Sequence, residues 1–158
     1  MNDPIFYKVV YQENSEQLTS VCRNFSYNSK YKLKYIPGVR TTPVENTKLF
    51  VFETLVKCIE FLNQEFDDWE RYNTIIFECE VENPIKAPEK IAFFSERNLN
   101  YFWERYNFWE RYNNVNVDDL HEREEYKLQR NCPEGTYFVD SLVLTKRIGN
   151  VNECLTQT

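Results

Sequence analysis

The chain has 158 residues, 42% of them hydrophobic and 16% aromatic, and a formal net charge of −6. A chain of this length and apolar content can bury one sizeable core, so disorder of the whole chain is excluded. The negative charge makes nucleic acid an unlikely partner, because a phosphate backbone repels a domain that lacks a basic patch. No apolar run approaches the roughly 18 residues of a membrane-spanning helix, so no membrane association is expected.

The cysteines and the first residues predict an intracellular location. Five cysteines are scattered without a CxxC pair, at Cys22, Cys58, Cys79, Cys132 and Cys154. An odd number of unpaired thiols is typical of a reducing compartment. The beginning of the chain, MNDPIFYKVVYQ, lacks the pattern of a signal peptide. Heavy use of Asn, Tyr, Phe and Lys is typical of low-GC genomes, so a viral or phage protein in the host cytoplasm or virion is expected.

The first third of the chain predicts strands. Ile5–Gln12 is rich in aromatic and β-branched residues, and Leu18–Phe25 can return beside it as a hairpin. Tyr31, Leu33 and Tyr35 alternate with lysines, which is the pattern of a half-buried strand.

The stretch from Lys48 to Phe66 predicts the structural centre of the domain. The continuous apolar run Leu49–Phe52 indicates a strand that is covered on both faces. Thr54 then suits a helix N-cap, because its hydroxyl can accept an unpaired backbone N–H. The helix is expected at about 54–67, with one apolar stripe that consists of Leu55, Ile59, Leu62, Phe66 and Trp69.

The rest of the chain completes an α+β fold. Asn73–Val81 predicts a strand, about 95–112 a second helix, and Thr136–Ile148 a last strand with room for a bulge near Asp140. Residues 115–131 are expected to be a charged surface segment. We therefore predict one α+β domain at 1–150 with a mixed or mostly antiparallel sheet, followed by a polar, frayed tail at 151–158.

The pentapeptide WERYN occurs three times, at Trp69–Asn73, Trp103–Asn107 and Trp109–Asn113. One interpretation is an exposed surface of aromatic and arginine side chains that binds a protein partner or a second copy of the chain. The other is a duplication that lengthens a helix, with the aromatic rings packed in the core. The candidate interaction residues are Trp103, Arg105, Tyr106, Trp109, Arg111 and Tyr112.

The sequence contains little that indicates catalysis. Its one histidine, His121, could bind a metal with Asp118 and Glu122 or Glu125, but such a cluster is more often a solvated run of charges. Glu78 and Glu80 have the spacing of a carboxylate pair and also that of the ordinary solvent face of a strand. No phosphate-binding loop, dinucleotide fingerprint or nucleophile elbow is present. We expect no catalytic residue, no metal and no cofactor.

Two resemblances accompany this interpretation. Tyr35–Gly38, Lys48–Phe52, Phe77–Pro84 and Pro133–Ile148 together resemble small domains of bacteria, phages and giant viruses, a likeness that covers about half the chain and implies no function.

The order of strand, helix and strand is also similar to the ADP-ribosyltransferase fold, in which a split sheet holds NAD. The nearest counterparts of that family's site residues are Tyr7, Ser20 and Glu134.

Because catalytic motifs are missing and aromatic residues are concentrated near the repeat, the leading hypothesis is a non-enzymatic domain for protein interaction or self-assembly. The alternative is a domain that binds a nucleotide or NAD-like ligand, and single-stranded nucleic acid comes third.

Overall fold

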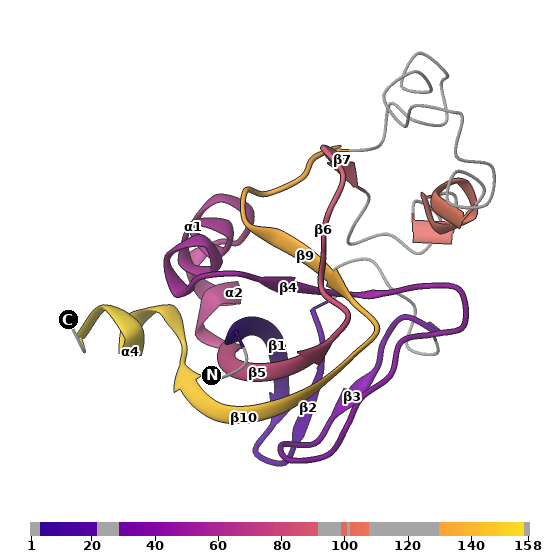
Figure 1. Ribbon diagram of the computed structural model, residues 1–158. Helices are drawn as coiled ribbons and strands as arrows, with labels where there is room; N and C mark the ends of the chain where they lie inside the picture. Colours follow the sequence, from indigo (N-terminus) through magenta and orange to yellow (C-terminus); the bar gives the residue numbers. More distant parts are fainter. Residues whose placement is uncertain (1–3, 22–28, 92–98, 101, 108–129, 157–158) are drawn as a thin grey trace.

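A computed structural model describes residues 4–21, 29–91, 99–100, 102–107 and 130–156. The chain forms an antiparallel sheet with short helices packed against it, which confirms the predicted α+β class (Figure 1). The strands are β1 (Phe6–Asn14), β2 (Gln17–Ser20), β3 (Lys34–Tyr35), β4 (Leu49–Phe52), β5 (Thr74–Glu82), β6 (Ile85–Lys86), β7 (Lys90–Ile91), β8 (Arg130–Asn131), β9 (Thr136–Val139) and β10 (Ser141–Gly149). The helices with named bounds are α1 (Leu55–Glu65), α2 (Asp68–Tyr72) and α4 (Val151–Thr156), and residues 99–100 and 102–107 are also helical.

The main sheet has the order β10-β5-β1-β4-β9-β6, and β2 joins β1 and carries β3 on its other side. Every pairing in it is antiparallel. Strands β7 and β8 form a separate two-stranded ribbon. The predicted strands of the first third are present, but the second ends at Ser20 and the third is reduced to Lys34–Tyr35. Residues 22–25 of the predicted second strand lie outside the described residues.

The predicted centre of the domain is confirmed. Strand β4 has side chains buried on both faces and is followed within three residues by α1. The Thr54 hydroxyl caps α1 by accepting the backbone N–H of Lys57 at 3.2 Å. The stripe residue Leu62 is fully buried and Ile59 is half-buried, so the helix covers the sheet with its apolar side as its periodicity indicated.

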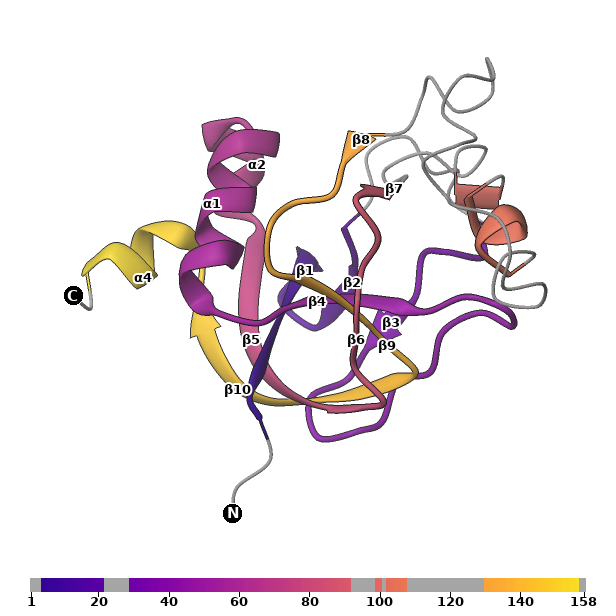
Figure 2. The same ribbon diagram turned by 45° about the horizontal axis from the view of Figure 1, so that its top comes forward.

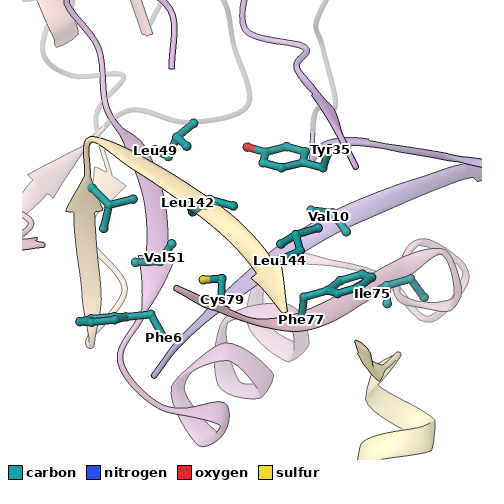
Figure 3. Close-up of a cluster of buried hydrophobic side chains, with 11 residues drawn as sticks. Phe6, Val10, Tyr35, Leu49, Val51, Ile75, Phe77, Cys79, Leu142 and Leu144 are labelled. Carbon is teal, nitrogen blue, oxygen red and sulfur yellow. The ribbon is translucent and has the colours of Figure 1, made fainter. Parts of the chain in front are cut away.

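One face of the sheet encloses a group of side chains that we call the inner cluster. It includes residues of β10 as well as residues of β4, although β5 and β1 separate these strands in the sheet. The sheet must therefore curl around the cluster, and Figure 3 shows Leu142 and Leu144 of β10 in one cluster with Leu49 and Val51 of β4. Its buried members are Phe6, Val10, Tyr35, Leu49, Val51, Ile75, Phe77, Cys79, Val139, Leu142 and Leu144.

The opposite face is covered by α1 and α4, and we call its side chains the α1 cluster. Its buried members are Val9, Phe52, Cys58, Leu62, Phe66, Ile76, Val151 and Cys154. The presence of Val151 and Cys154 corrects the prediction of a frayed tail. The last residues form a helix because two apolar side chains, three positions apart, share one helix face and can be buried together.

The helical residues 99–100 and 102–107 lie beside the loop between β3 and β4 (Figure 2). Two hydrogen bonds attach them to the rest of the domain, from the Tyr31 hydroxyl to Asn100 at 2.6 Å and from the Asn107 amide to the Asn46 carbonyl at 2.7 Å. Their apolar side chains form what we call the Trp103 cluster. Its buried members are Ile91, Leu99, Phe102, Trp103 and Phe138.

The predicted last strand is divided in two. Thr136–Val139 pairs with β4 and β6, whereas Ser141–Gly149 pairs with β5 at the other end of the sheet. The chain turns at Asp140, where the bulge had been predicted. Gly135 precedes β9 with a φ of +83°, and a Cβ there would lie 2.8 Å from Cγ of Lys57, so both the backbone and the space require glycine.

Candidate functional site

Strand β1 is paired differently along its two edges. One edge is paired with β5 from Phe6 to Tyr11 without interruption. The other edge is shared, because β4 pairs with it at Tyr7 and β2 pairs with it from Val10 onwards. Lys8 and Val9 therefore lie at a fork, where β4 leaves the strand and β2 joins it.

A cavity of about 140 Å³ lies at this fork. Its walls come from β1, β2, β4, the loops before and after β3, and Leu99 and Trp103 of the helical segment, with single residues from α1, β7 and β9. Aromatic rings and aliphatic side chains dominate the walls, which is typical of cavities that bind small molecules. The lining residues are Lys8, Val9, Ser20, Val21, Tyr31, Leu33, Tyr35, Pro43, Val44, Thr47, Lys48, Leu49, Phe50, Phe52, Phe61, Ile91, Leu99, Trp103, Pro133 and Thr136.

Two lysines are the only charged residues that the described part of the chain contributes to this lining. Lys8 is half-buried on the central strand, and its ammonium donates a hydrogen bond to the Phe50 carbonyl at 2.8 Å. The same ammonium lies 5.6 Å from the centre of the Tyr35 ring, within the range of a cation–π contact. The Phe50 carbonyl belongs to β4 just where β4 has left β1, so Lys8 bridges the fork.

The second lysine is already neutralised. Lys48 pairs with the Asp140 carboxylate at 2.6 Å, and Asn83 donates a further hydrogen bond to that carboxylate at 2.9 Å. These two hydrogen bonds hold the pKa of Asp140 below its ordinary value. Asp140 thereby anchors the turn between β9 and β10 next to the cavity wall.

The buried thiols do not form a reactive centre. Burial raises the pKa of Cys79 to about 12 and raises that of Cys58 further still, so both remain protonated at neutral pH. Neither thiol lines the cavity. They act as small apolar side chains, as their positions in the sequence indicated.

The structure describes three of the six candidate interaction residues, and they differ in burial. Trp103 is only 4% exposed and packs on Phe138, with ring centroids 5.1 Å apart. The structure therefore corrects its assignment to an exposed surface, because the helix turns this ring inward, as the core interpretation of the repeat predicts. Tyr106 and Arg105 are half-buried beside it. Trp109, Arg111 and Tyr112 lie outside the described residues.

The counterparts of the ADP-ribosyltransferase residues do not converge. Ser20 lines the cavity, but its hydroxyl accepts the backbone N–H of Leu33 at 3.0 Å. Tyr7 is not part of the lining, and burial together with the charge of Glu78 raises its pKa. The Glu134 side chain is 83% exposed and pairs with Lys57 at 3.1 Å.

Glu78 and Glu80, the possible carboxylate pair, differ in their exposure to solvent. Glu78 is half-buried and Glu80 is exposed on β5. The candidate metal ligands around His121 fall outside the described residues. Within the described part of the chain, no group of three or more His, Cys, Asp or Glu side chains could hold a metal ion. Among the helices described there, none combines the length and apolar character needed to cross a membrane.

Sequence reasoning missed the role of Lys8. The signal was a single charged residue in an otherwise apolar and aromatic strand, IFYKVVY. Such a lysine is usually assigned to the solvent face of an edge strand. Only the order of strands shows that β1 is central.

Comparisons with protein-family models, with curated proteins and with solved structures found no match to this chain. The chemistry of the cavity is therefore the basis for the functional argument.

Proposed function

We propose that this domain binds a small organic molecule in the cavity between β2 and β4. The observation that supports this most directly is the combination of a largely aromatic and aliphatic wall with a few polar groups. A fully apolar cavity of about 150 Å³ is known to admit benzene. A cavity of about 140 Å³ is thus large enough for one aromatic ring.

The size of the cavity also limits the alternatives. A whole dinucleotide could not be enclosed, so only one ring of an NAD-like ligand would enter.

The protein-interaction hypothesis is the weaker of the two that the sequence suggested, because Trp103, the first tryptophan of the tandem repeat, is buried in the core. The cavity does not explain the repeat.

The test is the thermal stability of the domain in the presence of candidate ligands. Neutral rings such as indole and toluene should raise the unfolding temperature, with a shift that grows with ligand concentration, because only the native state has the cavity. NAD, ADP-ribose and cyclic nucleotides form a second set, which tests whether a nucleotide is preferred. No shift with either set at millimolar concentration would contradict the proposal.

A pair of variants tests whether the ligand binds in this cavity. Val44 is half-buried and lines the cavity, so Val44→Trp should fill it and abolish the shift. Val39 is 53% exposed in the same loop region and is not part of the lining, so Val39→Trp is the matched control and should retain the shift. A shift that survives Val44→Trp would place the ligand elsewhere.

A further inference from the structure

We infer that the ligand of this cavity carries a negatively charged group, a carboxylate or a phosphate, which the Lys8 ammonium binds. This inference rests on the proposed function and adds the chemical class of the ligand. It starts from the charge of the lining, which among the described residues contains two lysines and no aspartate or glutamate. The chain as a whole has a net charge of −6, so the cavity differs in sign from the protein around it.

The two lysines are not equivalent. The charge of Lys48 is balanced by Asp140 at 2.6 Å. No carboxylate of the described residues pairs with Lys8, whose ammonium contacts the Phe50 carbonyl and the Tyr35 ring. A half-buried ammonium without a counter-ion is unfavourable, because it has lost hydration that no opposite charge replaces. An anion in the cavity would supply that charge.

Lys8 also has donors that remain for a ligand. An ammonium group carries three N–H donors, and the Phe50 carbonyl accepts one of them. If the only role of Lys8 were to satisfy this carbonyl at the fork, one neutral donor would be enough. The Tyr35 ring meets the same ammonium and lines the same cavity, so an aromatic ligand with an acidic group could contact ring and cation together.

The experiment compares phenylacetate with phenylacetamide, which have the same size and shape but differ in charge. Binding of both to the full chain is measured by calorimetry or by NMR titration. The wild type should bind phenylacetate about tenfold more tightly, since a hydrogen bond to a charged group contributes more than one between neutral groups. Phenyl phosphate, measured in parallel, distinguishes a preference for phosphate from one for carboxylate.

Variants test whether Lys8 causes the preference. Lys8→Met keeps a long, unbranched side chain without the charge. It should reduce the ratio of the affinities for phenylacetate and phenylacetamide to about one, while phenylacetamide still binds. Lys8→Arg should retain the preference. Lys146 is exposed on β10 and is not part of the lining, so Lys146→Met is the control and should leave the ratio unchanged.

The outcomes separate this inference from the proposed function. Equal binding of the two phenyl compounds by the wild type, or a preference that persists in Lys8→Met, would overturn the role of Lys8 and leave the cavity as a neutral site. If Lys8→Met does not fold, Lys8→Gln retains a donor without charge and is judged by the same ratio. If neither compound nor any neutral ring binds the wild type, the proposed function itself fails.

Discussion

The two edges of β1 show how one strand can support both a closed core and a cavity. Along the edge shared with β5, pairing continues over six residue pairs, and the side chains of Val10, Ile75 and Ile76 are buried there. Along the other edge, β4 and β2 divide the strand between them, and a cavity remains at Lys8 and Val9. Two strands that share one edge can therefore leave a cavity without an inserted domain.

The largest expected difference between the two edges is in packing. Ile76→Ala, on the closed edge, should lower the free energy of unfolding by about 3 kcal/mol, because it leaves a void among fully buried neighbours. Leu33→Ala removes a side chain of the same size from the cavity wall, where it is half-buried, and should cost about 1 kcal/mol. Urea unfolding of both variants measures this, and equal losses would contradict the contrast.

Thiol labelling compares how readily the closed core and the cavity wall open, without a mutation. Burial raises the pKa of all three thiols, but Cys58 and Cys79 are buried, whereas Cys132 is half-buried next to Pro133 of the cavity wall. Iodoacetamide should modify Cys132 at least about tenfold faster, because the other two thiols need the core to open. Mass spectrometry of peptides from the native protein gives the three rates. Similar rates would mean that the closed edge opens as readily as the cavity side.

The cap of α1 affects the cover of the closed edge. Thr54→Ala removes the acceptor of the Lys57 N–H and should lower the free energy of unfolding by about 1 kcal/mol. Thr42, which is exposed in the loop before Pro43, provides the control Thr42→Ala, expected to be nearly neutral. Denaturant unfolding distinguishes the two, and an equal effect would show that the cap does not hold the helix.

The smallest expected effect concerns the ion pair at the cavity wall. Because the folded state lowers the pKa of Asp140, its charge stabilises the fold above the unfolded pKa of about 4 and loses this effect as pH falls through the lower folded pKa. Asp140→Asn should therefore reduce stability at pH 7 by less than about 1 kcal/mol, since this carboxylate is 41% exposed. The difference from wild type should shrink below about pH 4. Unfolding curves at several pH values test this, and a constant difference would assign the effect to packing.

Local patterns predicted much of the fold and little of the site. The run Leu49–Phe52 and the stripe that follows Thr54 predicted β4 and α1, because burial on two faces or on one helix face leaves a direct trace in residue order. The split at Asp140 was not predicted, since residues on both sides of it favour strands equally. The repeat gave helix where it is described, but its composition could not show that Trp103 faces inward.

The sequence by itself determined the main strands β1, β4 and β5 and the helix α1, including where β4 ends and α1 begins. The tertiary structure alone decided that β1 is central, that β4 and β2 share its edge, and that Lys8 therefore faces a cavity instead of water. The physical reason is the range of the interactions. Periodicity and capping act between residues a few positions apart, whereas strand pairing joins residues as distant as Leu49 and Val139. The pairing of β4 and β2 along one edge of β1 leaves the Lys8 ammonium without a counter-charge among the described residues.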